Sequence, residues 1–184
     1  MRLARTLLVL VPTLLLPLIG CATAPSAAKA PVDGPRSVVC VRHAEKQSGD
    51  DPALTPAGQE RAEALARLLA AGDVTHLFAS QYRRTRETLA PLSAATGLAI
   101  EGYDAGDLEG LVERLDALPI GSVAVVAGHS NTVPPLVRAL GGDLRDTSDS
   151  DYGEVLADNA HDRAFLVLRG GSTTVVELQY GVDG

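Results

Sequence analysis

The sequence is short of aromatic residues. Its 184 residues include no tryptophan, two phenylalanines and four tyrosines. A stacking surface for single-stranded nucleic acid needs several aromatic side chains, so the composition does not favour one. Because 46% of the residues are hydrophobic, as in ordinary globular proteins, we expect a folded core made of leucine, valine and alanine.

Positive charge, cysteine and metal-binding spacings are also scarce. Sixteen basic residues against 23 acidic ones give a formal charge of −7, whereas a nucleic-acid-binding protein needs a basic surface. Two cysteines cannot form a disulfide framework. The four histidines lack the spacing of a zinc site, and no glycine-rich phosphate loop with a lysine is present. We therefore expect no nucleic-acid partner, no metal and no cofactor.

The N-terminal apolar run is too short to cross a membrane comfortably. It extends from Leu7 to Ile19, against the roughly 20 residues that a spanning helix needs, and Arg2 and Arg5 precede it. This pattern is typical of a secretory signal peptide. The segment Leu18-Ile19-Gly20-Cys21 resembles a bacterial lipobox. That resemblance implies cleavage before Cys21 and a lipid on its thiol; the alternatives are an ordinary signal peptide or a retained segment on a cytoplasm-facing protein.

Three segments follow from this interpretation. Residues 1–20 are the predicted lipoprotein signal peptide, and residues 21–36 are the lipidated cysteine and a flexible tether rich in alanine, proline and serine. Residues 37–184 are the predicted domain. Cleavage would change the net charge from −7 to −9. We expect an extracytoplasmic protein, lipid-anchored to a bacterial membrane and facing the periplasm. The absence of aspartate after Cys21 resembles outer-membrane sorting in Gram-negative bacteria.

Strand and helix patterns alternate along the predicted domain. Strands are expected at 37–41, 74–79, 98–103, 123–127, 164–168 and 174–180, and helices at 55–71, 83–95, 108–118 and 132–140. This order predicts an α/β fold around a mostly parallel sheet. The seven acidic residues between Asp143 and Asp162 do not fit a calcium loop, so we expect a solvated, mobile surface loop there.

Histidine and arginine residues follow three of the predicted strands. Arg42 and His43 follow the first, Arg84 lies shortly after the second, and His129 and Ser130 follow the fourth. Ligands of open α/β sheets bind at the carboxyl ends of strands, so these side chains should form one positive edge. Histidine can act as a covalent nucleophile, and arginine binds phosphoryl oxygens. The pattern predicts a site for a phosphate-like group.

Four ordered motifs resemble those of the histidine phosphatase superfamily, the phosphoglycerate mutase-like proteins. They are Val38 to Glu45 with its Arg-His pair, Leu54 to Gly58 followed by Arg61, Ser80 with Arg84 and Thr88, and Val125 to Ser130. The resemblance extends over about residues 37–181. It implies a three-layer α/β/α sandwich, and the short spacing between motifs leaves no large cap insertion.

The resemblance also implies the roles of the site residues. His43 would attack phosphorus and become phosphohistidine, while Arg42, Arg84 and His129, with Ser130 beside them, would bind the phosphorylated substrate. Arg83 and Arg86 compete with Arg84 for its role. Water would then release phosphate. His76 and His161 lie outside the motifs and are expected to be ordinary residues, and Cys40 is expected in the core.

Two positions depart from the family pattern. Ala44 replaces the glycine usual after the nucleophile, and no general acid is obvious. Asp104 is the preferred candidate acid, among four acidic residues after the third strand: Glu101, Asp104, Asp107 and Glu109. Short bacterial phosphohistidine phosphatases of the superfamily are similar in size and also lack an obvious acid.

The expected function is therefore a metal-independent phosphatase with a phosphohistidine intermediate. Its substrates would be phosphomonoesters or phosphoramidates outside the cytoplasm. The alternative is a catalytically weak envelope lipoprotein that binds phosphorylated ligands or a protein partner, and the sequence identifies no such partner.

Overall fold

The computed structural model describes residues 36–181. The predicted signal peptide, Cys21 and residues 22–35 of the predicted tether lie outside this range. The strands are β1 (Arg36–Arg42), β2 (His76–Ser80), β3 (Ile100–Tyr103), β4 (Val123–Gly128), β5 (Thr147–Ser150), β6 (Gly153–Leu156), β7 (Arg163–Arg169) and β8 (Thr173–Gln179). The helices are α1 (Pro56–Leu69), α2 (Arg83–Thr96), α3 (Leu108–Asp116) and α4 (Val133–Ala139).

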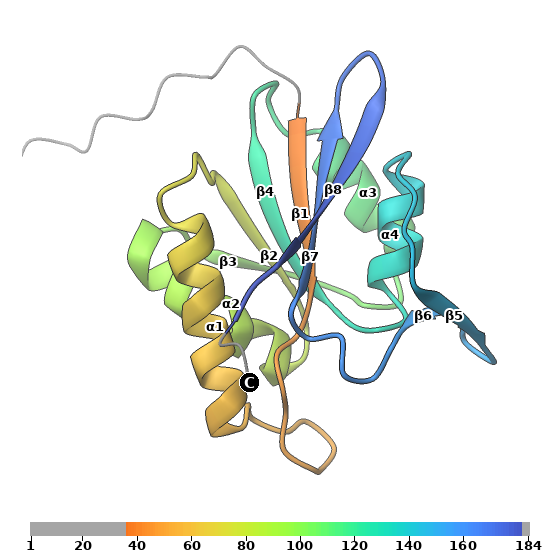
Figure 1. Ribbon diagram of the computed structural model, residues 1–184. Coiled ribbons are helices and arrows are strands. Elements are labelled where there is room, and N and C mark those ends of the chain that lie inside the picture. The colour runs from red at the N-terminus through yellow and green to blue at the C-terminus, as the bar shows by residue number, and fades with distance from the viewer. Residues whose placement is uncertain (1–35, 182–184) are drawn as a thin grey trace, which may run out of the picture. The chain divides into compact units, whose positions relative to one another are not determined.

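Six strands form one sheet in the order β3-β2-β4-β1-β7-β8 (Figure 1). The first four strands in this order are mutually parallel, whereas β7 runs antiparallel to β1 and β8 antiparallel to β7. The carboxyl ends of β1, β2 and β4 therefore meet at one edge of the sheet, where ligands bind in open α/β folds. The prediction of an α/β fold with a mostly parallel sheet is confirmed.

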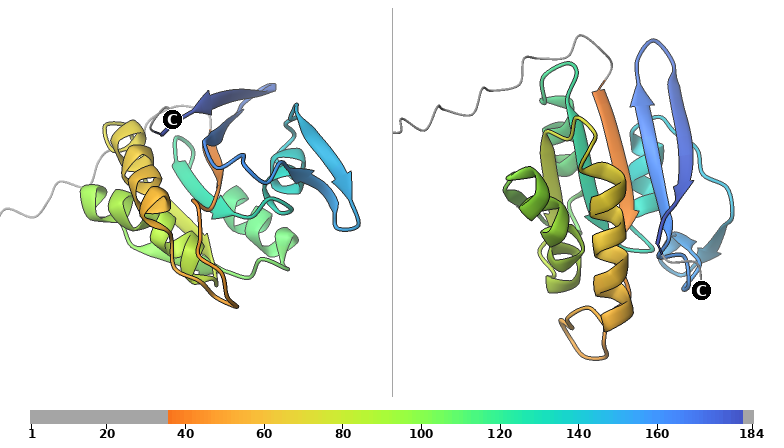
Figure 2. Two further views of the ribbon diagram at one scale, coloured as in Figure 1. Left: turned by 60° about the horizontal axis from the view of Figure 1, so that its bottom comes forward. Right: turned by 60° about the vertical axis from the view of Figure 1, so that its left-hand side comes forward.

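Helices α1 and α2 cover one face of the sheet and α3 and α4 cover the other, as the left view of Figure 2 shows. Side chains alternate along a strand, so Val39 and Val41 of β1 pack in the core on the α1–α2 side. Val38 and Cys40 pack in the core on the α3–α4 side. Cys40 is fully buried, as predicted, and burial raises the pKa of its thiol.

Helix α1 begins as its sequence predicts. The Thr55 hydroxyl accepts a hydrogen bond from Gly58 N at 3.1 Å, and Pro56 occupies the first turn, where no N–H is needed. Helix α2 ends at Gly97, which adopts a left-handed conformation with φ of 73°. Both helices are thus fixed by local signals at the ends that the sequence indicated.

The prediction of a loop in the acidic segment from Asp143 to Asp162 is wrong for the two strands Thr147–Ser150 and Gly153–Leu156. Strands β5 and β6 pair there as an antiparallel hairpin, seen beside α4 in Figure 1. The Arg138 guanidinium of α4 donates to the carboxylates of Glu154 and Asp143, and Leu156 N donates to Ser130 O at 2.9 Å. Contacts with α4 and with the segment after β4 therefore order this part of the chain.

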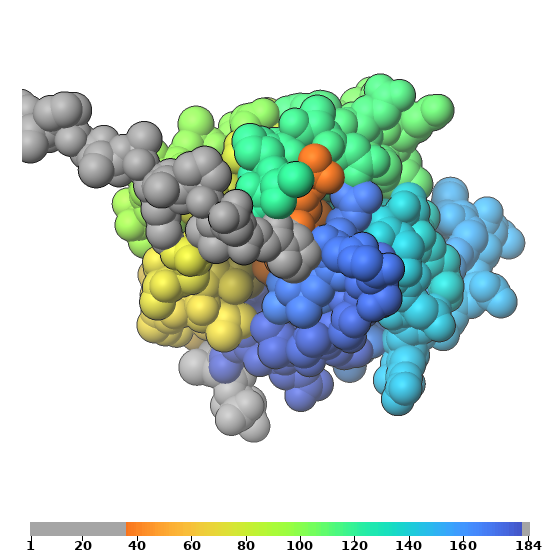
Figure 3. Space-filling model, turned by 90° about the horizontal axis from the view of Figure 1, so that it is seen from above, coloured from red at the N-terminus to blue at the C-terminus, as the bar shows by residue number. Residues whose placement is uncertain are grey.

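The opposite edge of the sheet carries the start of β1. Figure 3 looks onto this edge, where the first residues of β1, the loop before β4 and the turn between β7 and β8 lie together. Arg36 is the first residue of β1, and its Nε donates to Leu118 O at 2.7 Å. Within residues 36–181, no helix is long and apolar enough to cross a membrane.

Candidate active site

Two histidines meet at the carboxyl edge of the sheet. His43 directly follows β1 and His129 directly follows β4, and these strands are paired so that Arg42 lies opposite Gly128. His43 N donates to Gly128 O at 2.9 Å. The ring centroids of His43 and His129 are 5.5 Å apart, and both side chains are buried. Strand pairing thus brings together two histidines separated by 86 residues.

The ring of His43 is held in one tautomer. Its Nδ1 lies 2.8 Å from Ala44 O, and because a carbonyl only accepts, Nδ1 carries the proton. The lone pair of the neutral ring is therefore on Nε2. Burial lowers the pKa of His43 to about 3, and the nearby His129, Arg42 and Arg84 contribute in the same direction. His43 is thus a neutral imidazole with a free nucleophilic nitrogen at physiological pH.

His129 is held by a chain of hydroxyl groups. Arg84 Nη2 lies 3.3 Å from His129 Nδ1, and since a guanidinium only donates, Nδ1 carries the lone pair. His129 Nε2 therefore donates to Ser80 Oγ at 2.9 Å, and Ser80 Oγ is 2.9 Å from Thr85 Oγ1. The pKa of His129 is lowered to about 4, mainly by burial and to a smaller extent by the positive charges of Arg84 and Arg42.

Arg42 and Arg84 bring two positive charges to the histidine pair. Arg42 Nη1 donates to Ala157 O at 2.8 Å and to Asp158 O at 2.9 Å. The Nε atoms of Arg42 and Arg84 are both buried and have no hydrogen-bond partner among the described residues. Buried N–H groups without acceptors are costly, so these guanidinium groups are suited to an anion that supplies the missing oxygens.

The neighbouring arginines of α2 point elsewhere. Arg83 Nε donates to Glu87 on the exposed surface, and Arg86 lies near Gly102 of β3. The structure therefore brings Arg84, and neither competitor, to His129. Ser130 lies beside the site, and its carbonyl accepts from Leu156 N.

The segment after His43 is fixed by α1 and α2. Ala44 is fully buried, and its N–H donates to Thr88 Oγ1 at 2.9 Å. Glu45 receives three hydrogen bonds from the Arg61 guanidinium, the shortest at 2.6 Å. The two family-like motifs that contain Arg61 and Thr88 thus hold the main chain that follows His43.

Two residues near the site were missed by the sequence analysis. His161 Nδ1 donates to His43 O at 2.7 Å, and the two rings are 5.6 Å apart. Asp51 Oδ1 lies 3.9 Å from Arg84 Nη1. His161 shortly precedes a strand of the predicted terminal pair, and this position indicates the site only once the direction of that strand is known. Asp51 lies in a polar loop without such a signal.

Asp104 follows β3 on the same edge of the sheet, but its hydrogen bonds lead away from the histidines. Its Oδ1 accepts from Gly106 N at 2.9 Å and lies 3.4 Å from Gln81 Nε2. Of the other three candidate acids, Glu101 is paired with Arg114, and Asp107 caps α3. Glu109 lies in the first turn of α3. Within residues 36–181, none of these four acidic side chains therefore forms a hydrogen bond with His43.

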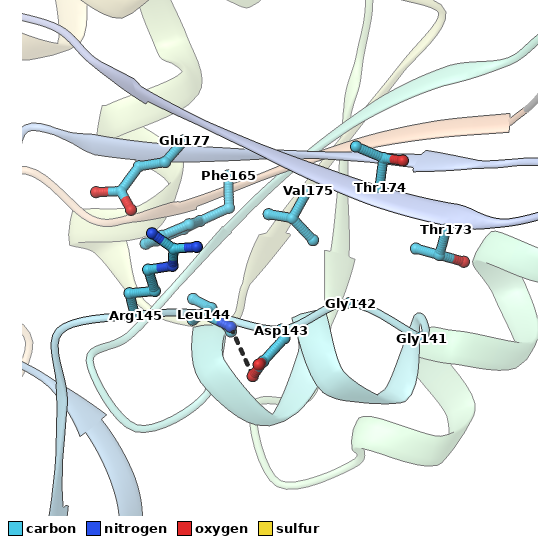
Figure 4. Close-up of a pocket in the computed structure, with 10 residues that line it drawn as sticks. All are labelled: Gly141, Gly142, Asp143, Leu144, Arg145, Phe165, Thr173, Thr174, Val175 and Glu177. Atoms are coloured by element: carbon cyan, nitrogen blue, oxygen red, sulfur yellow. Dashed lines mark hydrogen bonds between the residues drawn. The ribbon is translucent and has the colours of Figure 1, made fainter.

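A cavity lies away from this site. It has a volume of about 610 Å³ and lies between β8 and the segment Gly141 to Arg145, as Figure 4 shows. Its lining is mixed, with Glu177 and Arg145 beside Val175 and Phe165. Across residues 36–181, no group of three or more His, Cys, Asp or Glu side chains is arranged to hold a metal ion.

At the carboxyl edge of the parallel strands, a buried histidine with a free Nε2 lies beside a second histidine and two arginines whose buried Nε groups lack acceptors, an arrangement suited to a phosphoryl group. The family profile described as histidine phosphatase superfamily (branch 1) matches residues 38–140. This chain belongs to the histidine phosphatase superfamily. No curated protein matches the sequence closely enough to count as a relative.

Solved structures share the fold at low sequence identity. Protein histidine phosphatase SixA in complex with tungstate superposes with a TM-score of 0.59 at 17% identity, covering 78% of this chain and 96% of that one. Mycobacterial glucosyl-3-phosphoglycerate phosphatase Rv2419c gives 0.56 at 16% identity, covering 80% and 99%. The protein named mycobacterial hydrolase 2 gives 0.60 at 14% identity, covering 82% and 93%.

Proposed function

We propose that this protein is a metal-independent phosphatase that hydrolyses phosphomonoesters or phosphoramidates through a phosphohistidine at His43. The observation that carries the proposal is the site's electrostatic arrangement. A neutral His43 with a free Nε2 lies beside two arginines whose buried Nε groups lack acceptors. Phosphoryl transfer depends mainly on positioning and charge stabilisation, and these residues supply both.

The reaction proceeds in two steps. His43 Nε2 attacks phosphorus, and the bond from phosphorus to the ester oxygen or amide nitrogen breaks, with its electron pair going to the leaving group. The leaving group takes a proton from water or from a nearby acid. Water then attacks the phosphohistidine and gives up a proton to the solvent, the N–P bond breaks, and its electron pair returns to Nε2. Arg42 and Arg84 hold the phosphoryl oxygens in both steps, and His129 orients Arg84 by accepting a hydrogen bond from its Nη2.

Relatives of the same fold support a phosphatase with either kind of substrate. Two of them are named as a protein histidine phosphatase and a glucosyl-3-phosphoglycerate phosphatase. The P–N bond of a phosphoramidate breaks with less acid assistance than the P–O bond of an alkyl ester. The Asp104 carboxylate is engaged by Gly106 N and Gln81 Nε2, and this favours phosphoramidates, or esters with good leaving groups.

The lack of an acidic side chain bonded to the histidine pair among residues 36–181 also fits a second function. A site that binds phosphate but lacks a general acid would serve a catalytically weak lipoprotein that recognises phosphorylated ligands or a protein partner. Such a protein would bind inorganic phosphate through Arg42 and Arg84 without turnover.

The test compares the full chain, purified in detergent, with its His43→Ala variant. p-Nitrophenyl phosphate and phosphoramidate are each supplied with EDTA present. We expect turnover in the wild type and a loss of at least about a thousandfold in His43→Ala. His76→Ala is the matched control, since His76 lies at the amino end of β2, and it should retain turnover. Equal turnover in wild type and His43→Ala, or turnover abolished by EDTA, would contradict the proposal.

We further propose that the enzyme acts outside the cytoplasm, anchored by a lipid on Cys21. The proposal rests on the basic N-terminus, the short apolar run and the lipobox-like residues before Cys21. A periplasm-facing enzyme on the outer membrane is the arrangement expected in a Gram-negative host.

A further inference from the structure

A carboxylate lies beside one of the two site arginines. Asp51 is in the loop that joins β1 to α1, the orange loop at the lower end of Figure 1. Its Oδ1 is 3.9 Å from Arg84 Nη1, and Arg84 Nη2 is in turn 3.3 Å from His129 Nδ1. The two terminal nitrogens of Arg84 thus connect the histidine pair to an acidic side chain, with no main chain between them.

The loop is attached to the helix that carries Arg84. Leu54 N donates to Glu87 Oε2 of α2 at 2.7 Å. Asp51 Oδ1 accepts from Arg83 N at 2.8 Å, in the first turn of the same helix. Because α2 fixes both the guanidinium and the carboxylate, their close approach is a property of the fold.

Asp51 lies on the solvent side of this contact. Its side chain is 52% exposed, whereas that of Arg84 is 14% exposed. The hydrogen bond from Arg83 N and the contact with Arg84 both use Oδ1, and within residues 36–181 Oδ2 has no hydrogen-bond partner. The organic group of a substrate has to extend from the covered guanidinium toward solvent, and the Asp51 carboxylate lies on that side.

A carboxylate at this position is unfavourable for a site that binds only an anion. Its negative charge repels a phosphoryl group and competes with it for Arg84. Capping α2 does not require the charge, because an asparagine oxygen would also accept from Arg83 N. The second arginine has acidic neighbours too: burial lowers the pKa of Arg42, and the negative charges of Asp158 and Glu45 oppose that effect. Negative charge beside both arginines would attract a cation.

We infer that Asp51 is a specificity-determining residue that binds a positive charge on the organic group of the substrate. The inference rests on the proposed function. The substrates that fit are phosphate esters or phosphoramidates with an ammonium or guanidinium group a few bonds from phosphorus. The anion and the cation of such a molecule would meet Arg84 and Asp51 together, and each charge would gain a partner in place of water.

The test uses two phosphonates that cannot be hydrolysed, so that binding is measured apart from catalysis. 2-Aminoethylphosphonate and propylphosphonate are equal in length and differ in a terminal ammonium or methyl group. Isothermal titration of the full chain in detergent at about pH 9, where the phosphonates are dianionic and the amine is protonated, gives each dissociation constant. We expect 2-aminoethylphosphonate to bind about threefold to fivefold more tightly, as for a half-exposed ion pair. No preference, or no binding of either ligand, would overturn the inference.

A pair of variants assigns the preference to one carboxylate. Asp51→Asn removes the charge and keeps an oxygen that can accept from Arg83 N, so the preference should disappear. Asp50→Asn makes the same change of charge at the neighbouring exposed residue, which has no ion pair with either site arginine, and it should keep the wild-type ratio. An unchanged ratio in Asp51→Asn, or an equal loss of preference in Asp50→Asn, would contradict the assignment and overturn the inference.

Propylphosphonate also shows whether the phosphoryl site of the variant is intact. It should bind to Asp51→Asn at least as tightly as to the wild type, because Arg84 loses a competing carboxylate. Weaker binding would mean that Asp51 supports the structure of the site, and this outcome would overturn the specificity role.

The proposed function is tested separately by the release of phosphate from phosphoramidate in the wild type and His43→Ala. A protein that prefers 2-aminoethylphosphonate through Asp51 but releases no phosphate would retain this inference and lose the enzymatic proposal. A protein that hydrolyses phosphoramidate but does not distinguish the phosphonates would do the reverse.

Discussion

At the scale of single residues, the site depends on which nitrogen of each histidine carries its proton. The Ala44 carbonyl fixes the proton of His43 on Nδ1, while Arg84 leaves the proton of His129 on Nε2. His161 has its proton on Nδ1 because it donates to His43 O. All three assignments follow from partners that can only accept or only donate. His161 thus holds the main chain of His43, the proposed nucleophile, and we propose that it is a positioning residue.

Replacing His161 should therefore slow the chemical step. His161→Ala removes the bond to His43 O, and a net hydrogen-bond contribution of about 1 kcal/mol corresponds to a loss in kcat of roughly fivefold. The KM should change little, since the arginines remain in place. Asparagine has its side-chain nitrogen near the position of Nδ1, so His161→Asn should recover most of the loss. Steady-state phosphate release measures both constants. An equal loss of kcat in His161→Ala and His161→Asn, or a change in KM alone, would contradict the positioning role.

The lowered pKa values of His43 and His129 predict an acid-sensitive fold. Burial holds their pKa values in the folded protein at about 3 and about 4, whereas an unfolded histidine titrates near 6.5. Below about pH 6.5 the unfolded chain binds protons that the folded protein does not. The stability is therefore fully present above about pH 6.5 and decreases as the pH falls toward the folded values.

The variant His43→Asn isolates one of these titrations. Its free energy of unfolding should fall less steeply than that of the wild type between about pH 6 and pH 4, by up to about 1.4 kcal/mol per pH unit. Urea unfolding at several pH values measures the two slopes. Carboxylates contribute equally to both proteins, so identical slopes would mean that His43 is protonated in the folded state.

The sequence predicts that a residue lies at the site only if the direction of the neighbouring strand in the sheet is known. Arg42, His43 and His129 follow strands with buried apolar patterns, and parallel pairing brings them to one edge. His161 precedes β7 instead, and it reaches the same edge because β7 runs antiparallel to β1. The apolar pattern of a strand does not reveal its direction, so the sequence alone could not place His161.

At the scale of elements, the start of α1 depends on a close approach to the segment after the nucleophile. Gly58 lies in the first turn of α1, where a Cβ atom would be 2.1 Å from Glu45 O. Thr55 N also donates to Glu45 O at 2.9 Å. The helix can therefore contact the main chain of the site loop only if residue 58 has no side chain.

Substituting Gly58 with alanine should destabilise the protein. Alanine suits a helix better than glycine, but the clash with a main-chain carbonyl outweighs that gain of about 1 kcal/mol. We expect a net decrease of about 1–3 kcal/mol in the free energy of unfolding, as for other overpacked sites. Gln59→Ala, at the next and exposed helix position, should stay within about 0.5 kcal/mol. Urea unfolding compares the two variants, and an unchanged Gly58→Ala would show that the helix can move without loss.

The elements that the sequence predicts are those with strong local signals. The four helices and six main strands have apolar periodicity, a cap or a glycine stop, and the structure differs only at their ends. The β5–β6 hairpin has none of these. Its strands have four residues each and are mostly polar, and they are ordered by Arg138 of α4 and the Ser130 carbonyl. Such tertiary contacts between distant segments are not visible in a local pattern.

At the scale of the whole molecule, the site lies at one edge of the sheet, and the segment that leads to the predicted anchor joins the domain at the opposite edge. The site lies at the carboxyl end of β1, and Arg36 lies at its start, about 20 Å away for seven residues of strand. Fifteen residue steps separate Cys21 from Arg36, a reach of at most about 50 Å. A protein attached in this way can present its site away from the lipid. A net charge of −9 after cleavage also disfavours contact of the domain with an anionic surface.

The lipid anchor is the feature on which this arrangement depends, and Cys21→Ser tests it. In a Gram-negative bacterium supplied with an alkyne-tagged fatty acid, the wild type should take up the label and sediment with membranes. Cys21→Ser should lose the label, because serine offers no thiol for the lipid. Cys40→Ala should keep it, since Cys40 is fully buried in β1. An unlabelled wild type that is secreted freely would indicate an ordinary signal peptide. A Cys21→Ser protein that still sediments with membranes, with its first twenty residues intact, would indicate a retained N-terminal segment, and either result would contradict the anchor.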